Sequence, residues 1–438
     1  WQREFEEEFE YAETEDQLRC VEEIKRDMER PVPMDRLLCG DVGYGKTEVA
    51  FRAVMKCVLD GKQAAVLVPT TVLARQHFLN ALRRFAKYPV TIDVVSRFRT
   101  SAQMKETLRR VESGEVDILI GTHRLFNRDV RFKDLGLLVV DEEQRFGVQH
   151  KEKLKENFRQ VDVLTLSATP IPRTLALILY GDLDVSIIDQ LPPGRQPVQT
   201  FAVTGGYHQR VYRFIRKLVG EGRQAYIVCP MVEENDQLPD ERKAVTEYAK
   251  KLQSEVFPDL KVAFVHGKMK PKEKDAVMAA FAAHETDILV STTVIEVGVD
   301  VPNAAVMVIE NAERFGLSQL HQLRGRVGRG KHQSYCILIS DNRNEETRQR
   351  LKVMTKTTDG FQIAEEDLRL RGPGDFFGAR QHGLPGLKVA DLGCDTQLLQ
   401  EARQAAEQLL AQDPALTSCP ATAERVTELF TQQADALN

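Results

Sequence analysis

The sequence lacks the features of several common protein classes. It has a single tryptophan, and its seven cysteines form no CxxC pair. Because cysteines lie inside apolar runs such as DRLLCG and SYCILIS, we expect buried free thiols rather than disulfides or zinc ligands. No signal peptide and no run of 18 apolar residues is present, so we expect a cytoplasmic location and no membrane partner.

An excess of positive charge is also missing. The formal net charge is −5, which argues against a protein that binds nucleic acid through bulk basicity, so any contact with nucleic acid must come from short basic motifs. No NKxD element is present, which counts against a GTPase. The chain begins with Trp1 rather than methionine, and this indicates a fragment or an engineered chain.

The sequence does contain a repeated α/β pattern. Its 438 residues are more than a single hydrophobic core usually supports. Short apolar runs alternate with amphipathic stretches, as expected for buried parallel strands between helices. The runs are 36–40, 63–69, 91–96, 116–122, 135–142 and 161–169, then 224–230, 261–267, 286–292, 304–310 and 334–340. The segment LPPGRQP at 191–197 separates the two series and reads as a linker.

We therefore predict two α/β lobes with parallel sheets, followed by a helical region. The predicted division is an N-terminal helical segment, a first lobe, a second lobe and a C-terminal helical region, over residues 1–30, 31–194, 195–345 and 346–438. VDILIGT at 116–122 and TDILVST at 286–292 are nearly the same strand, which favours two similar domains.

The strongest chemical motif is GDVGYGKT at 40–47, between an apolar strand and a helical run. Gly40, Gly43 and Gly45 would let backbone N–H groups close around phosphate oxygens at a helix N-terminus. Lys46 would reach the β- and γ-phosphates of ATP, and the Thr47 hydroxyl would bind Mg²⁺.

A second motif, DEEQ, follows the apolar strand LGLLVV. Asp141 would hold Mg²⁺ at the carboxyl end of that strand, and Glu142 would orient the attacking water. Upstream, Gln17 lies at a distance from the phosphate loop that suits an amide reading adenine, although an ordinary helix start explains it equally well.

The motif QLHQLRGRVGRG at 319–330 concentrates arginines and glycines without an acidic residue. A solvated charge run would mix lysine with glutamate and needs no glycine. We predict that Arg326 and Arg329 stabilise the γ-phosphate as arginine fingers, and we place Gln322 with them in the catalytic set. Because they belong to the other lobe from Lys46, hydrolysis would depend on how the lobes meet.

Hydroxyl and basic residues at strand ends form a third group. Such groups suit contacts to a nucleic-acid backbone that do not depend on base sequence, although plain strand-to-helix turns remain an alternative. The candidates for DNA binding are Thr70, Thr71, Thr122, His123, Arg124, Thr292 and Thr293. Gly298 and Asp300 are placed to face the nucleotide.

Taken in order, GDVGYGKT, VPTTVLA, GTHRL, DEEQ, SATPIPRT, STTVIEVGVD and QLRGRVGRG resemble the superfamily 2 helicases and translocases. Residues 1 to about 155, with SRFRT and VVDEEQRFGVQHKEKLK, resemble the motor of the bacterial transcription-repair coupling factor. From SATPIPRT onward, stretches such as VHGKMKPKEKDAVM and DLRLRGPGDFFGARQHGLP resemble the branch-migrating DNA helicase RecG. A natural intermediate or a chimera joined near 156–167 would give this pattern.

Both resemblances imply tandem RecA-like domains that use ATP and Mg²⁺ to move on double-stranded or branched DNA. They also imply a coupling element within 365–383, with Arg371, Arg380 and Gln381 as its test residues. The wedge domain of RecG relatives and the RNA polymerase contact module of the coupling factor are absent from this sequence, so it predicts motor chemistry more firmly than substrate choice.

The resulting hypothesis is a monomeric ATP-dependent translocase or helicase motor core that acts in DNA repair, recombination or fork remodelling. An RNA helicase is one alternative, and DEEQ in place of an Asp-Glu-Ala-Asp box weighs against it. A nucleotide-gated DNA-binding scaffold with little turnover is the other alternative.

Overall fold

The computed structural model describes residues 1–96, 99–141, 160–168, 183–194, 196–229, 241–292, 301–371 and 396–436. One compact unit comprises residues 1–170 and 182–363 and contains both sheets, and a second includes the chain from Ala364 onward. Within the described residues, no helix combines the length and apolarity that crossing a membrane requires.

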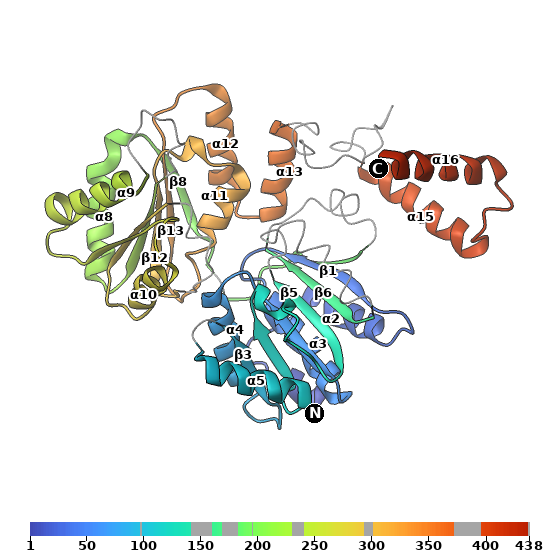
Figure 1. Cartoon of the computed structure of the whole chain (residues 1–438). Coiled ribbons are helices and arrows are strands. Elements are labelled where there is room, and N and C mark those ends of the chain that lie inside the picture. Colours follow the sequence, from blue (N-terminus) through green and yellow to red (C-terminus); the bar gives the residue numbers. More distant parts are fainter. Residues whose placement is uncertain are drawn as a thin grey trace. The chain divides into compact units, whose positions relative to one another are not determined.

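The first lobe is built on a seven-stranded parallel sheet with the order β3-β4-β2-β5-β6-β1-β7 (Figure 1). Its strands are β1 (Asp35–Gly40), β2 (Gln63–Leu67), β3 (Ile92–Val95), β4 (Ile118–Gly121), β5 (Leu135–Asp141), β6 (Asp162–Ser167) and β7 (Asp184–Ile188). The helices are α1 (Gln2–Glu7), α2 (Glu15–Met28), α3 (Lys46–Leu59), α4 (Thr71–Arg84), α5 (Ser101–Ser113) and the 3₁₀ helix η1 (His123–Phe126).

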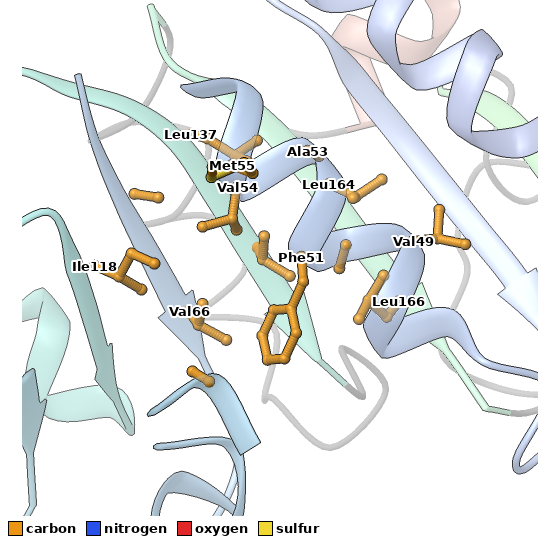
Figure 2. Packing of buried hydrophobic residues seen from close by; sticks show 14 of the residues in the cluster. Val49, Phe51, Ala53, Val54, Met55, Val66, Ile118, Leu137, Leu164 and Leu166 are labelled. Atoms are coloured by element: carbon orange, nitrogen blue, oxygen red, sulfur yellow. The ribbon is translucent and has the colours of Figure 1, made fainter. Parts of the chain in front are cut away.

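Helix α3 lies on this sheet and forms the centre of the first core (Figure 2). Its apolar side chains Val49, Phe51 and Val54 pack with Val66 of β2 and Leu164 of β6. Since the strands are buried on both faces, their near-continuous apolar runs follow from the parallel arrangement. The packing fixes the start of α3, and with it the loop that precedes Lys46.

The second lobe repeats the design with a six-stranded parallel sheet of order β10-β11-β9-β12-β13-β8. Its strands are β8 (Gln199–Val203), β9 (Gln224–Val228), β10 (Val262–Val265), β11 (Ile288–Ser291), β12 (Ala304–Ile309) and β13 (Tyr335–Ile339). Helices are α8 (His208–Gly220), α9 (Glu241–Lys251), α10 (Pro271–Ala282), α11 (Leu317–Arg324) and α12 (Glu345–Lys356), with short turns η3 (Gly205–Tyr207), η4 (Leu252–Val256) and η6 (Ala312–Arg314).

The two sheets confirm the predicted α/β fold. They also confirm that the two nearly identical strand sequences mark two similar domains. Taken in chain order, β8 to β13 occupy the same positions as β1 to β6, so VDILIGT and TDILVST supply the equivalent strands β4 and β11. Every apolar run predicted as a strand contains one. The predicted linker 191–197 lies between β7 and β8, where Gly194 has a φ of +83°.

Two strands, β7 and β8, were not predicted. Both lie at the edges of their sheets, and β8 has no buried residue. An edge strand with one solvated side carries mixed polar and apolar residues, so DVSII and QTFAV lack the continuous apolar signal of the central strands.

The predicted helical C-terminal region is confirmed. It contains α13 (Gly360–Arg371), α15 (Thr396–Gln412) and α16 (Pro420–Ala436). At the other end of the chain, Phe5 of α1 is buried against Phe85 and Tyr88 of the first lobe. Cys20, Cys39, Cys57 and Cys336 are buried free thiols as predicted, whereas Cys229 and Cys419 are free but only half-buried. Cys394 lies outside the described residues.

Candidate nucleotide site

The predicted phosphate loop joins β1 to α3 at the carboxyl edge of the first sheet. Gly43 and Gly45 adopt left-handed conformations, with φ of +79° and +81°, and Gly45 is the N-cap of α3. The Lys46 ammonium is buried and donates to the carbonyl oxygens of Gly40 at 2.6 Å and Asp41 at 2.7 Å. The loop therefore holds its own lysine at a helix N-terminus, the arrangement that binds anionic phosphate.

Gln17 braces this loop from α2. Its side-chain amide donates to the carbonyl oxygen of Tyr44 at 2.9 Å, while its oxygen accepts from the Thr14 N–H at 2.9 Å in a capping box. A Cβ at Gly45 would lie 2.3 Å from the Gln17 nitrogen, so only glycine fits there. Gln17 thus contacts the loop as its predicted role requires, and adenine reading remains a prediction.

The second lobe meets the phosphate loop through α11, which carries the arginine-rich motif. The His321 Nε2 atom lies 2.7 and 2.8 Å from the two carboxylate oxygens of Asp41. Gly325, at the end of α11, packs on Val42, whose Cβ would lie 3.1 Å from a Cβ at position 325. Both contacts place the arginine motif directly beside the loop that carries Lys46.

The electrostatics of Asp41 reflect this contact. Burial would raise the pKa of its carboxyl group, but the hydrogen bond from His321, the Val42 N–H at 2.6 Å and the Lys46 charge outweigh burial. The pKa of Asp41 consequently lies below its ordinary value of 3.8, and the side chain is a carboxylate at neutral pH.

The predicted arginine fingers lie at the end of α11. Arg326 is buried, Arg329 is half-buried, and the Arg329 Nε donates to the Gly325 carbonyl at 3.0 Å. Gln322 lies within α11 and is also half-buried. The motif is thus next to the phosphate loop, while the action of these three side chains on a γ-phosphate remains a prediction.

Asp141, the predicted magnesium ligand, ends β5 and has a partner that the sequence did not suggest. Its Oδ2 atom lies 2.9 Å from Nε2 of His77, a buried residue of α4. The His77 Nδ1 atom has no hydrogen-bond partner among the described residues. Since a carboxylate only accepts, Nε2 of His77 carries a proton and donates it to Asp141.

Several predicted residues lie outside the described part of the chain: Glu142, Thr293, Gly298, Asp300, Arg380 and Gln381. Arg371 is the last residue of α13. No group of three metal-ligating side chains of the His, Cys, Asp or Glu type occurs among the residues that are described. Thr47 is half-buried in the first turn of α3, where its predicted role needs it.

The candidate DNA-binding residues differ in accessibility. His123 is exposed, and Arg124 forms an ion pair with Asp129 at 2.5 Å. The Thr70 hydroxyl caps α4 by accepting from the Leu73 N–H. Thr71 and Thr122 are buried and Thr292 is 0% exposed, so DNA contact by these three would require a conformational change. Their assignment stays a prediction.

Sequence reasoning missed Asp41, His77 and His321 as site residues. His77 belongs to the buried face of α4 with Leu73, Ala74 and Ala81, so a polar residue on an apolar face was the available signal. His321 lies inside the arginine motif. The sequence shows this histidine among the basic residues but does not show which residue it contacts.

Comparison with known families agrees with this geometry. The DEAD/DEAH box helicase family matches residues 14–178, and the helicase conserved C-terminal domain matches residues 207–331. Residues 357–429 match the family described as ATP-dependent DNA helicase RecG, domain 3, C-terminal. The first match contains β1 to β6 of the first sheet, and the second contains β9 to β12 of the second sheet.

Curated relatives come from both families that the sequence resembles. The chain is 49% identical over 407 residues to the ATP-dependent DNA helicase RecG of Synechocystis, covering 93% of this chain and 49% of that protein. For RecG of Bacillus subtilis the identity is 48%, covering 91% and 58%. For the transcription-repair-coupling factor of Bacillus subtilis it is 49%, covering 92% and 33%. The chain thus spans about half the length of the RecG relatives.

Solved structures show the same relationship. A structure of RecG bound to a three-way DNA junction matches with a TM-score of 0.76 and 46% identity, covering 91% of this chain and 52% of that one. The DEAD-box helicase Mss116 shares the fold at a TM-score of 0.58 and 18% identity. With a phosphate loop and an arginine motif meeting between paired helicase domains, the chain belongs to the superfamily 2 helicases.

Proposed function

We propose that this chain is the motor core of an ATP-dependent translocase that moves on double-stranded or branched DNA. The observation that carries the proposal is the contact between Asp41 of the phosphate loop and His321 of the arginine motif. One nucleotide site thereby receives residues from both lobes, so its chemistry depends on how the lobes meet. RecG, the relative whose solved structure holds a three-way DNA junction, supports DNA as the substrate.

The residues at the site have distinct roles in this proposal. Lys46 would leave its backbone acceptors to bind phosphate oxygens, and the N-terminus of α3 would add its positive dipole. Arg326 and Arg329 would stabilise the negative charge that develops in the transition state. Gln322 would position these arginines, and Glu142 would orient the attacking water.

Magnesium fits the oxygen donors at this edge. Thr47 begins α3 after β1, Asp141 ends β5, and β6 lies between these strands. Strand spacing places the two strand ends about 10 Å apart, a gap that side chains, water and phosphate oxygens together can bridge. When bound, the ion would neutralise phosphate charge, and His77 would keep the Asp141 carboxylate oriented.

The biological setting proposed is DNA repair, recombination or fork remodelling, with the chain acting as a monomer. RecG and coupling-factor relatives match nearly the same share of this chain at similar identity. Of the two families, RecG fits the chain better overall, because a RecG-specific domain matches its C-terminal region. A separate origin for the two halves remains a hypothesis.

The direct test measures ATP hydrolysis with and without linear duplex DNA, together with ATP-dependent displacement of a third strand from a triplex. We expect duplex DNA to stimulate hydrolysis and the third strand to be displaced, and Lys46→Ala and Arg329→Ala to lower both strongly. Equal hydrolysis in wild type and both variants would refute the motor. Tight ATP binding without turnover under any DNA condition would favour the scaffold, and stimulation by single-stranded RNA alone would favour an RNA helicase.

A further inference from the structure

A continuous chain of hydrogen bonds runs from the second lobe into the phosphate loop. The Arg324 Nη2 donates to His321 Nδ1 at 2.8 Å, and the opposite ring nitrogen of His321 contacts Asp41. The backbone carbonyl of Asp41 in turn accepts from Lys46. All three side chains that form this relay are almost fully buried, with 2% of Arg324, 5% of His321 and 4% of Asp41 exposed.

The arginine determines the tautomer of the histidine. A guanidinium group can only donate, so Nδ1 of His321 must be an unprotonated acceptor. Nε2 therefore carries the ring proton and donates it to the Asp41 carboxylate. Because a charged acceptor strengthens this hydrogen bond and the site is dry, the bond sets the orientation of Asp41 firmly.

Arg324 is itself held in place by its own lobe. Its Nη1 donates to the carbonyl oxygens of Met354 at 2.8 Å and Thr357 at 3.0 Å, at the end of α12. These acceptors belong to the second lobe. They hold the guanidinium in place, so it does not move with Asp41. The relay is consequently rigid at one end and attached to the phosphate loop at the other.

We propose that His321, oriented by Arg324, is a positioning residue for the phosphate loop, and that it determines through Asp41 where Lys46 rests before ATP binds. The inference rests on the proposed nucleotide-driven function but concerns the loop in the absence of nucleotide. Without the donated hydrogen bond, Asp41 becomes a buried carboxylate on which the Lys46 charge already acts. Lys46 would then pair with Asp41 and bind ATP less readily.

Two substitutions separate the halves of the relay. In His321→Gln the terminal amide replaces Nε2, so the donor to Asp41 is kept and the acceptor for Arg324 is lost. In His321→Asn the amide replaces Nδ1, so the contact to Arg324 is kept and the donor to Asp41 is lost. His284→Ala, at an exposed histidine of the same lobe, is the matched control.

The experiment measures KM and kcat for ATP at saturating duplex DNA, and the affinity for a fluorescent ADP without DNA. We expect His321→Asn to raise KM and weaken ADP binding about tenfold while kcat stays within about threefold. His321→Gln should remain within about threefold of wild type on every measure, and His284→Ala should match wild type. An unchanged KM in His321→Asn, or equal losses in the Asn and Gln variants, would overturn the inference.

A second measurement reads the tautomer of His321 in the wild-type chain itself. In ¹⁵N spectra of the wild-type chain, the His321 ring should show an unprotonated Nδ1 and a protonated Nε2, with the signal identified by its loss in His321→Gln. Protonation on Nδ1 would overturn the relay. If wild type shows no DNA-stimulated hydrolysis, the proposed function fails, whereas the ADP affinities and the ring tautomer still decide the relay.

Discussion

The six strands of the second lobe repeat the order of β1 to β6 in the first, yet the predicted phosphate loop and magnesium ligand both belong to the first lobe. In the first lobe β1 leads through the phosphate loop to Lys46 at the start of α3, and β5 ends in Asp141. In the second lobe β8 leads through η3 to His208 at the start of α8, and Glu310 directly follows β12. The second lobe therefore keeps the same edge but carries different side chains there.

Those side chains are hydrogen-bonded to one another and to the backbone at the second edge. The Gly205 N–H donates to the Asp341 carboxylate at 2.8 Å, so a protein carboxylate takes the backbone donor that a phosphate would use. His208 Nε2 lies 3.0 Å from Glu310, and the Tyr248 hydroxyl donates to the same carboxylate at 2.9 Å. The comparison teaches that the fold provides an edge for a site, and that the loop sequence decides which side chains line it.

The largest effect is expected from Arg326→Ala. If the second lobe contributes a transition-state contact to the first lobe's site, kcat for ATP should fall on the order of 10³-fold while ADP affinity changes little. Steady-state hydrolysis and fluorescent ADP titration measure the two quantities. A parallel loss of ADP affinity would mean that Arg326 binds the ground state instead.

Replacing the equivalent residues Lys46 and His208 by alanine, one in each lobe, tests the comparison directly. Lys46→Ala should lower ATP hydrolysis about 10²-fold, because it removes a fixed positive charge from the phosphate site. His208→Ala, at the matching position of the second lobe, should leave hydrolysis within about twofold. A large loss in the His208 variant would show that the second edge takes part in nucleotide chemistry.

Two glycines with the same backbone conformation sharpen the contrast further. Gly45 and Gly222 have φ of +81° and +82°, but a Cβ at Gly45 would lie 2.3 Å from Gln17, whereas a Cβ at Gly222 meets nothing within 4 Å. Gly222→Ala should destabilise by about 1 kcal/mol from backbone strain alone. Gly45→Ala should lose about 2 to 3 kcal/mol and weaken ATP binding, as urea unfolding and ADP titration would measure. Equal losses would contradict the role of Gln17 as a brace.

The smallest expected effect concerns pH. Burial would lower the pKa of His208, but its hydrogen bonds and the charge of Glu310 outweigh burial and raise that pKa above 6.5. The stabilisation is therefore complete below pH 6.5 and lost as pH rises through the raised pKa. Between pH 6 and 8.5, wild type should lose about 2 °C more in Tm than His208→Gln. If Tm depends on pH in the same way in wild type and His208→Gln, the pair of His208 and Glu310 does not stabilise this edge.

Much of the fold was predictable because its signals are local. Central strands such as β2 and β12 are buried along their whole length, so their sequences are apolar throughout. The edge strands β7 and β8 escaped prediction because one of their sides faces no neighbouring strand. The phosphate loop was predictable for a similar reason, since its glycines and the lysine after them act within a few residues of one another.

The sequence by itself determined the local chemistry: which loop can hold a phosphate, which motif concentrates arginines, and which runs must lie inside a sheet. Only the tertiary structure decided that His321 meets Asp41, 280 positions away, and that His77 meets Asp141. It also decided that Asp341 accepts from Gly205 and that Glu310 meets His208 at the edge of the second lobe. The physical reason is that strand order and helix packing choose the partners of distant side chains, and no local pattern encodes that choice.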